Sequence, residues 1–264
     1  MKPGKNQRVP VLVYHHVYTD EEAARFEGAA GVIGLTEFRR QLQWILTEGW
    51  NPVSTTAAVD WLLGKGTLPE RACVVHFDNG WLDTFSIALP YLTELGVTAT
   101  CFPITSGIAA ASSGDSISVR TLTEGVVENP FMDWQQLGHL AEQGWQIGAH
   151  THTHGKVADQ HDLDGDGAVL REVEESHSLF QKHLGFVPEH FAYPSGSRND
   201  RTDEILLEHY QSLRLWRWDW PISWKLTDHS TPVHAIESQN VDSRVSFEEF
   251  QRIFHEAGEA PSED

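Results

Sequence analysis

The chain has 264 residues, of which 40% are hydrophobic, and it carries a formal net charge of -19 at pH 7. This length and apolar content predict a soluble globular protein with a substantial core, built as one α/β barrel or as two small domains. The strong negative charge argues against nucleic acid or an anionic membrane surface as a partner.

Membrane and export signals are not apparent in the sequence. No stretch approaches the roughly 20 consecutive apolar residues of a membrane span, and residues 1–10 contain no apolar signal-peptide core. We therefore expect a cytoplasmic protein with no membrane partner. Its two cysteines, Cys73 and Cys101, each lie in an apolar run, which favours buried reduced thiols over a disulfide, although neighbouring strands would permit a bridge.

The first third of the chain alternates between strand and helix patterns. Residues 9–17 are rich in β-formers and end in Tyr14-His15-His16, which predicts a first strand with His15 or His16 near a site or serving as a structural group. Apolar residues spaced by three, four and seven predict a helix over 35–46, with Thr36 as its N-cap and Gly49 as its stop.

A second strand is predicted where the apolar run from Cys73 meets an acidic residue and breaks at Gly80. Such a buried parallel strand delivers its last side chains to the rim of an α/β sheet or barrel. We therefore place Asp78 and Asn79 at that rim. Further elements are helices over 55–63 and 84–95 and a strand over 98–104.

Residues 107–130 are rich in Ser, Gly and Ala and show little periodicity. We interpret them as a long rim loop that helps to cover a substrate, or as a mobile surface loop. A capped helix over 133–144 then leads into the next strand.

Three histidines at alternate positions end that strand, at 150, 152 and 154. The i, i+4 spacing of His150 and His154 brings two imidazoles to one metal ion if the segment turns helically. With a nearby carboxylate, they would form a catalytic zinc site with one open position.

The acidic segment after these histidines imitates half of a calcium loop, with Asp162, Asp164 and Asp166 at positions 1, 3 and 5. Position 12 is Val173, where such a loop requires a bidentate Glu. We therefore favour an acidic turn before a helix over 168–184, whose N-terminal dipole attracts these carboxylates.

The last part of the chain contains a sharp turn at residues 191–196 (Phe-Ala-Tyr-Pro-Ser-Gly) and a Trp-rich run over 213–221. A strand and a capped amphipathic helix follow over 241–254, and residues 257–264 are expected to form a frayed polar tail. The repeated strand and helix alternation predicts parallel βαβ units, and hence a barrel or a doubly wound sheet.

Three motifs in this order resemble those of the polysaccharide deacetylase family, also known as the NodB-homology or carbohydrate esterase 4 enzymes. They are residues 77–80 (Phe-Asp-Asn-Gly), 150–154 (His-Thr-His-Thr-His) and 191–196. The resemblance implies an α/β fold, an incomplete (β/α)7 barrel, formed as a single domain over residues 1–264. It also implies a metal-dependent hydrolase that removes N-acetyl or O-acetyl groups from a carbohydrate, acting on C–N bonds other than peptide bonds. The expected partner is an N-acetylated sugar, oligosaccharide or glycan intermediate.

The same resemblance implies roles for individual residues. Asp78 matches the catalytic base, His150 and His154 match the metal ligands, and His152 would point away. The backbone N–H of Ser195 would stabilise the oxyanion. The general acid would be His234 or His229. Aromatic residues beside the motifs are candidate sugar contacts: Trp81, Tyr193 and Trp220.

The chain departs from the family pattern at three places. Asn79 stands where the family has a second, metal-binding aspartate, Ala192 stands where some members have an arginine, and only the final Asp219-Trp220 of a fourth motif is present. Arg214 or Arg217 would have to replace the missing arginine in space.

Asn79 leaves three alternatives. Its carbonyl binds a cation weakly, Asp78 or Asp83 becomes the charged ligand, or the protein is a metal-free relative that binds a carbohydrate or docks a partner.

Overall fold

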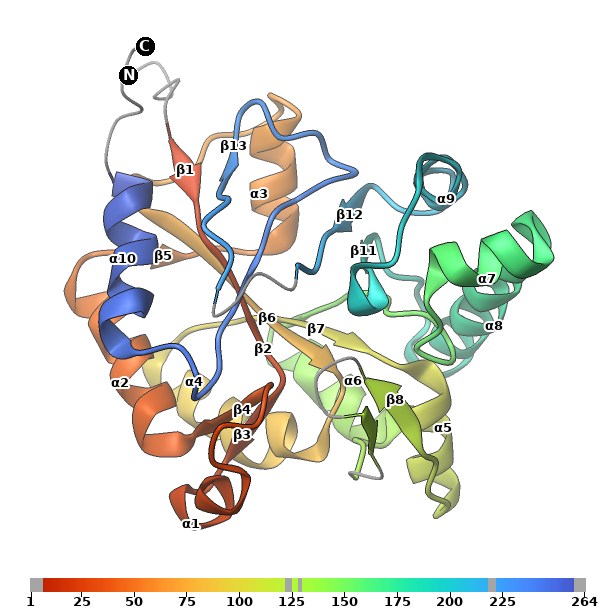
Figure 1. Ribbon diagram of the computed structural model, residues 1–264, viewed down its shortest axis with the longest axis horizontal. Coiled ribbons are helices and arrows are strands. Elements are labelled where there is room, and N and C mark those ends of the chain that lie inside the picture. Colours follow the sequence, from red (N-terminus) through yellow and green to blue (C-terminus); the bar gives the residue numbers. More distant parts are fainter. Residues whose placement is uncertain (1–6, 122–124, 128–129, 218–221, 259–264) are drawn as a thin grey trace.

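The computed structural model describes residues 7–121, 125–127, 130–217 and 222–258 (Figure 1). Parallel strands surround the centre of the described part of the chain. They are β2 (Val11–Tyr14), β6 (Ala72–Asn79), β7 (Thr100–Pro103), β10 (Gln146–Ile147), β11 (His190–Ala192), β12 (Ser212–Arg214) and β14 (Gln239–Asn240).

Pairing between these strands runs around a ring. The main sheet has the order β10-β7-β6-β2-β14, and β11 pairs with β12. Single parallel bridges, from Ala149 to Phe191 and from Arg214 to Ile236, connect the two groups. The expected incomplete (β/α)7 barrel is therefore confirmed.

Short strands decorate the barrel. β1 (Arg8–Val9) pairs antiparallel with β13 (Thr227–Asp228), and β5 (Asn51–Pro52) lies parallel to the start of β6. β3 (His16–Tyr18) pairs with β4 (Val32–Gly34), while β8 (Val119–Thr121) and β9 (Gly125–Val127) form an antiparallel pair.

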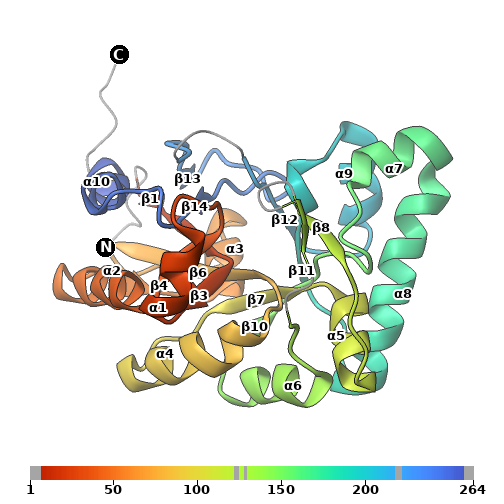
Figure 2. The ribbon, with the colours of Figure 1, turned by 60° about the horizontal axis from the view of Figure 1, so that its bottom comes forward.

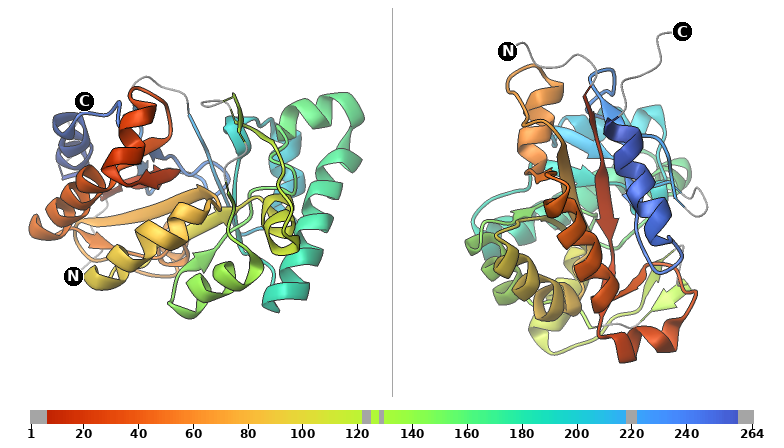
Figure 3. Two further views of the ribbon diagram at one scale, coloured as in Figure 1. Left: turned by 90° about the horizontal axis from the view of Figure 1, so that it is seen from below. Right: turned by 90° about the vertical axis from the view of Figure 1, so that its left-hand side faces the viewer.

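Helices lie outside the strands, as Figures 2 and 3 show. They are α1 (Asp20–Ala23), α2 (Leu35–Thr47), α3 (Thr55–Leu62), α4 (Leu89–Leu95), α5 (Thr105–Ser113), α6 (Trp134–Glu142), α7 (Val157–Asp164), α8 (Asp166–Leu184), α9 (Asp200–Leu207) and α10 (Phe247–Gly258), with short 3-10 or π turns η1 (Ala24–Phe26), η2 (Thr84–Ala88) and η3 (Pro194–Gly196).

Local sequence signals explain several of these helices. α6 begins at a capping box, in which Asp133 accepts from the N–H of Gln136 and Gln136 accepts in return. α4 ends at Gly96 in the left-handed conformation, as predicted. The N-cap of α2 differs from the prediction: Gly34 occupies it, and Thr36 donates instead to Asp20.

Aromatic packing attaches α10 to the outside of the fold. Its Phe254 ring lies 5.3 Å from the Trp44 ring and 4.9 Å from the Trp50 ring. Phe250 and Ile253 are buried beside it. Each such side chain contributes about 1.5–3 kcal/mol by leaving water. This helix extends to Gly258 and buries Ala257, so the predicted frayed tail does not begin at 257; residues 259–264 lie outside the described part.

The predicted rim loop over 107–130 is corrected in its first part. Residues 105–113 form α5, and the segment that follows contains the β8–β9 pair. Gly107 packs closely in this helix, because a Cβ there would lie 2.6 Å from the Phe131 ring. A small residue is therefore needed at this position.

The acidic segment after the histidines is divided between two helices. Asp162 and Asp164 lie in α7, whereas Asp166 begins α8. There Asp166 binds Arg201, with 2.6 Å between Oδ2 and Nη2. Cys73 and Cys101 are free and buried, as expected of reduced thiols. Among the helices of the described residues, none combines the length and apolar character needed to span a membrane.

Candidate active site

The carboxyl end of β6 is where that strand leaves the sheet. Asn79, with φ 74°, and Gly80, with φ 83°, both adopt left-handed backbone. A Cβ on Gly80 would lie 2.8 Å from Cβ of Pro103 on β7, so only glycine fits this turn. Asp78 and Asn79 are each 1% exposed and are the last side chains of the strand. They lie at the end of the barrel where parallel strands present functional groups.

Arg214, at the end of β12, forms a buried ion pair with Asp78. Its Nη2 lies 2.5 Å from Oδ1 and 2.6 Å from Oδ2 of Asp78. Burial would raise the pKa of Asp78, but the charge of Arg214 and its hydrogen bond hold it well below the usual range of a carboxyl group. Asp78 is therefore ionised at neutral pH.

Of the two arginines considered as replacements for the family arginine, Arg214 is the one that contacts Asp78. Arg217 instead binds Glu237, with 2.6 Å between Nε and Oε2. The guanidinium thus reaches the site from β12 rather than from the turn that follows β11.

His15 follows β2 and faces the same carboxylate. Its Nε2 lies 4.0 Å from Oδ2 of Asp78, and its imidazole is 13% exposed. Burial lowers the pKa of His15 to about 4, although the charge of Asp78 opposes this. Of the two histidines at the end of the first strand, His15 is therefore the one in the site, as a neutral group within reach of solvent.

His16 belongs to a structural cluster with Asp83 and Trp81. Its Nδ1 lies 2.7 Å from Oδ2 of Asp83, whose Oδ1 accepts from the Val17 N–H at 2.8 Å. These contacts occupy Asp83, which argues against its alternative role as a charged metal ligand. Trp81 stacks on His16 with centroids 4.8 Å apart and is 0% exposed. The prediction that Trp81 contacts sugar is wrong, since its ring has no exposed face.

His150 and His154 come together in the loop after β10. Their ring centroids lie 5.0 Å apart. No helix produces this convergence; instead Thr151, with φ 64°, and His154, with φ 62°, turn the backbone twice through the left-handed region. The two rings thus lie next to each other, although the helical turn on which their spacing made this depend is absent between these residues; their role as metal ligands stays a prediction.

The chemistry of His150 suits a metal ligand. Its Nδ1 lies 2.8 Å from the Ala192 carbonyl oxygen, and because a carbonyl only accepts, Nδ1 must carry the proton. Burial lowers the pKa of His150 to about 3, against the opposing charge of Asp78. The ring is therefore neutral, with its lone pair on Nε2, and is oriented as in ligating histidines.

Asn79 supplies a third donor of the right kind. Its Oδ1 is buried and has no hydrogen-bond partner among the described residues, which is the state expected of an oxygen that would bind a cation. No three His, Cys, Asp or Glu side chains in the described ranges gather into a metal site. By donor type, the two imidazoles and the amide oxygen suit a cation, without the carboxylate that strengthens such sites.

His152 points away from the pair, as the resemblance implied. Its Nδ1 lies 3.0 Å from Oγ1 of Thr105, and its Nε2 lies 3.3 Å from Oε2 of Glu175. Both ring nitrogens thus face partners on α5 and α8.

The turn after β11 brings Ser195 into a left-handed conformation, with φ 53°. Gly196 is required next to it, because a Cβ there would lie 2.0 Å from the Trp216 carbonyl oxygen. Tyr193, predicted to contact sugar, is 0% exposed and donates its hydroxyl to Oδ1 of Asp203 at 2.6 Å. That prediction is wrong, because the ring is enclosed by the fold.

The two histidines expected to act as general acid lie in the segment between β12 and β14. The ring of His229 packs against Trp61 of α3 in a tilted arrangement, with centroids 4.1 Å apart. His234 is next to Val233, whose carbonyl accepts from the N–H of Leu213 in the middle of β12. Among the described residues neither histidine has a hydrogen bond or ion pair with Asp78, and the acid role of both stays a prediction. Trp220, the third predicted sugar contact, lies outside the described residues.

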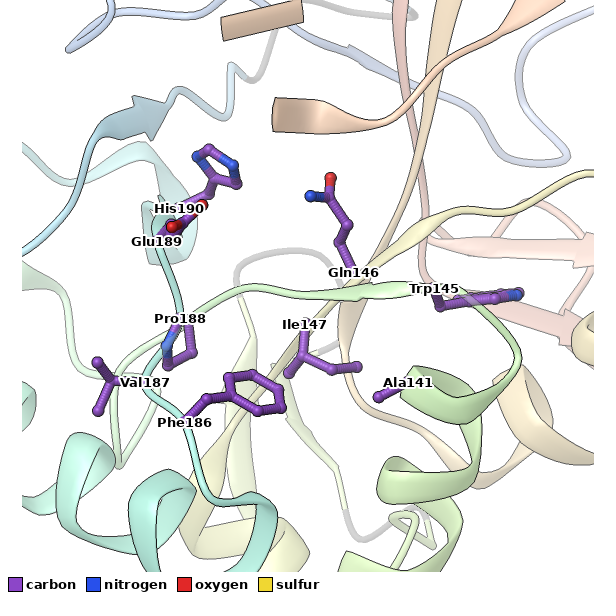
Figure 4. A pocket seen from close by; sticks show the side chains of 9 residues that line it. All are labelled: Ala141, Trp145, Gln146, Ile147, Phe186, Val187, Pro188, Glu189 and His190. Carbon is purple, nitrogen blue, oxygen red and sulfur yellow. The ribbon is translucent and has the colours of Figure 1, made fainter. Parts of the chain in front are cut away.

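A separate pocket of about 340 Å³ lies at the amino ends of β10 and β11 (Figure 4). Phe186, Val187 and Ile147 line its apolar part, and Gln146 and His190 line its polar part. None of the predicted catalytic or metal-binding residues lines this pocket. It is therefore distinct from the site around Asp78.

Comparison with known proteins places these observations in a family. Residues 65–211 match the model of the family described as polysaccharide deacetylase. YxkH of Bacillus subtilis (strain 168), which is named after the same family, is 25% identical over 208 residues. That match covers 76% of this chain and 62% of YxkH. The poly-beta-1,6-N-acetyl-D-glucosamine N-deacetylase of Escherichia coli (strain K12) is 24% identical over 151 residues, which cover 57% of this chain and 21% of that protein.

Solved structures share the fold. A de-N-acetylase from Aggregatibacter actinomycetemcomitans aligns with a TM-score of 0.76 and 20% identity, covering 93% of this chain and 99% of that one. The deacetylase PplD of Streptococcus pyogenes aligns with a TM-score of 0.74 and 20% identity, covering 94% and 98%. At these identities, the likeness supports the architecture alone.

Proposed function

Because this chain belongs to the polysaccharide deacetylase family, we propose that it is a hydrolase that removes N-acetyl groups, or O-acetyl groups, from a carbohydrate. The observation that carries the proposal is the arrangement around Asp78. Arg214 fixes this carboxylate, His15 approaches it to 4.0 Å, and His150 is close enough for their charges to affect each other's pKa. All four groups lie at the carboxyl end of the barrel strands.

Hydrolysis of the acetamide requires water to attack the acetyl carbon, after which the C–N bond breaks and the amine leaves with a proton. Asp78, ionised at neutral pH, orients the attacking water and accepts its proton. A carboxylate held at such a low pKa is a weak base, so the reaction needs a water that is already acidic. In this proposal His150, His154 and Asn79 would hold a divalent cation, zinc, which when bound would supply that acidity and polarise the carbonyl.

The remaining roles fall to groups at the edge of the site. His15 is neutral, partly exposed and adjacent to Asp78, so it must first take up a proton before it can give one. In our proposal it replaces His234 as the group that receives the proton that Asp78 accepts from the attacking water and passes it to the leaving amine. The N–H of Ser195 remains the proposed oxyanion donor, because its left-handed turn is held by Gly196 against Trp216.

The substrate that we propose is an N-acetylglucosamine oligomer. Its support is the name of the Escherichia coli relative, a poly-beta-1,6-N-acetyl-D-glucosamine N-deacetylase. The matched region spans 62% of the length of YxkH and 21% of that of the Escherichia coli protein. The proposal therefore concerns only the part of those proteins that this chain matches.

A second candidate function is a catalytically impaired relative that binds a carbohydrate or docks a partner. The observation that favours it is Asn79 itself, because an amide oxygen carries no charge and holds zinc less firmly than a carboxylate.

Metal content and acetate release separate the two functions. We would measure both for the wild type, for Asn79→Asp and for His150→Ala, using β-1,6-linked N-acetylglucosamine oligomers, with β-1,4-linked oligomers as the comparison. Zinc bound by the wild type and lost in His150→Ala, together with acetate release, supports the hydrolase. Zinc and acetate release in Asn79→Asp but not in the wild type would identify the impaired relative. If neither the wild type nor either variant binds metal or releases acetate, the proposed hydrolase is contradicted.

A further inference from the structure

Glu172 is a buried carboxylate whose contacts all lead away from its own helix. It lies on α8 and is 7% exposed. Its Oε2 accepts from the His152 N–H at 2.7 Å and from the Thr153 N–H at 2.9 Å. Its Oε1 accepts from Oγ1 of Thr153 and, at 2.9 Å, from Nε2 of Gln160. Each oxygen therefore serves two donors.

Three of those four donors belong to the loop that carries His150 and His154. That loop passes through the left-handed region at Thr151 and again at His154, where residues other than glycine are disfavoured. A loop in this conformation requires contacts from outside to maintain it. Glu172 provides them at the centre of the loop, between the two histidines.

We propose that Glu172 is a positioning residue, which holds the loop so that His150 and His154 converge. The inference rests on the proposed function, since convergence matters only if the pair binds a metal. Glu172 is not itself a ligand, because its oxygens are occupied by the loop and by Gln160, and because it joins no cluster of metal-binding side chains in the described ranges.

The charge of the group is part of the argument. An ionised carboxylate is acceptor-only, with two oxygens that can each take two hydrogen bonds. A glutamine has the same shape, but it would turn an NH₂ group toward two of the four donors. Glu172→Gln therefore removes the interaction with little change in volume.

The matched control is Glu174→Gln, the same change on the exposed face of α8. Both substitutions would be made in the wild type and in Asn79→Asp. The measurements are the Kd for zinc, by competition with a chelator, and amide hydrogen exchange of residues 151–155. We expect Glu172→Gln to weaken zinc binding by about 10–100-fold and to speed exchange at His152 and Thr153, while Glu174→Gln changes neither.

The outcomes separate this inference from the function on which it rests. Zinc binding that is equal in Glu172→Gln and its parent overturns the positioning role, even if exchange becomes faster. If neither parent binds zinc, the proposed function fails. Amide exchange then still tests the inference, because unchanged exchange at His152 and Thr153 in Glu172→Gln would show that Glu172 does not position the loop. Should Glu172→Gln not fold, Thr153→Val removes one donor at an exposed residue, and we expect a smaller weakening of zinc binding in the same direction.

Discussion

One guanidinium nitrogen of Arg214 lies within 2.6 Å of both carboxylate oxygens of Asp78, although the two residues are 136 positions apart in the sequence. Both side chains are enclosed, at 2% and 1% exposure. Each charge is therefore compensated mainly by the other, because water does not reach either group.

Arg214→Met is expected to destabilise the protein by about 3–5 kcal/mol, because it leaves the Asp78 charge buried without its partner. Urea unfolding measures the loss. Arg217→Met is the control, since its ion pair with Glu237 is partly exposed and should cost about 1 kcal/mol or less. Adding Asp78→Asn to Arg214→Met should recover most of the stability. A loss no larger than that of Arg217→Met would contradict the buried pair.

Local patterns in the sequence predicted the parts of the site that lie on continuous segments. The apolar run ending at Asp78 and Asn79 and the strand before His150 were identified because strand ends and histidine spacing are short-range features. The partner of Asp78 was not identified, because the sequence does not distinguish Arg214 from Arg217. Which of the two reaches Asp78 depends on how distant strands come together in the barrel.

Burial explains the predictions that failed. Trp81 and Tyr193 stand beside the motifs and so resembled sugar contacts, but both are buried. Trp81 packs against His16 and Phe131, and Tyr193 is bonded to Asp203, contacts that the local sequence does not reveal. Glu172 was missed for a different reason. It lies in the same helical stripe as the buried Val169 and Ser176, and an acidic residue in an otherwise buried stripe is a signal that sequence inspection could have used.

His15→Gln is expected to lower kcat for acetate release by about 10²–10⁴-fold with little change in KM, because general acid catalysis acts on the transition state. The assay would use whichever of the wild type and Asn79→Asp is active. His234→Gln serves as the control, and we expect its kcat to match that of its parent. The reverse result, with kcat lost in His234→Gln alone, would return the acid role to His234.

Gly196→Ala is expected to destabilise the protein by more than about 2 kcal/mol. The new Cβ would lie 2.0 Å from the Trp216 carbonyl oxygen at φ 65°, so steric conflict adds to the cost of about 1–2 kcal/mol for a left-handed residue. Gly185→Ala is the matched control, because Gly185 has φ 81° but nothing within 4 Å of a Cβ. Urea unfolding should show the larger loss at Gly196, and equal losses would mean that the turn yields to the added methyl group.

A buried histidine, His190, takes part in a hydrogen-bonded network near the amino end of β11. His190 is 3% exposed, and its Nε2 and Nδ1 each lie 2.9 Å from a hydroxyl oxygen, of Thr56 and Ser212 respectively. Burial lowers the pKa of His190 to about 4, from 6.5 in an exposed imidazole. Between about pH 6.5 and pH 4, His190 therefore binds a proton in the unfolded chain but not in the folded protein.

This difference in pKa makes stability depend on pH in a defined direction. Above pH 6.5, His190 is neutral in both states and has no effect on stability. As the pH falls from 6.5 toward 4, the unfolded chain binds the proton first and stability decreases, by about 2 kcal/mol between pH 7 and pH 5 for this one group. Below pH 4, both states are protonated and the loss of stability stops growing.

The test is urea unfolding of the wild type and of His190→Gln at pH 7 and at pH 5. The free energy of unfolding that is lost between these two pH values should be about 2 kcal/mol smaller in His190→Gln than in the wild type. The control is His139→Gln, at an exposed imidazole, which should lose as much as the wild type. If His190→Gln loses as much stability on acidification as the wild type does, His190 is not the protonation site, and other buried histidines such as His76 would have to account for the acid sensitivity.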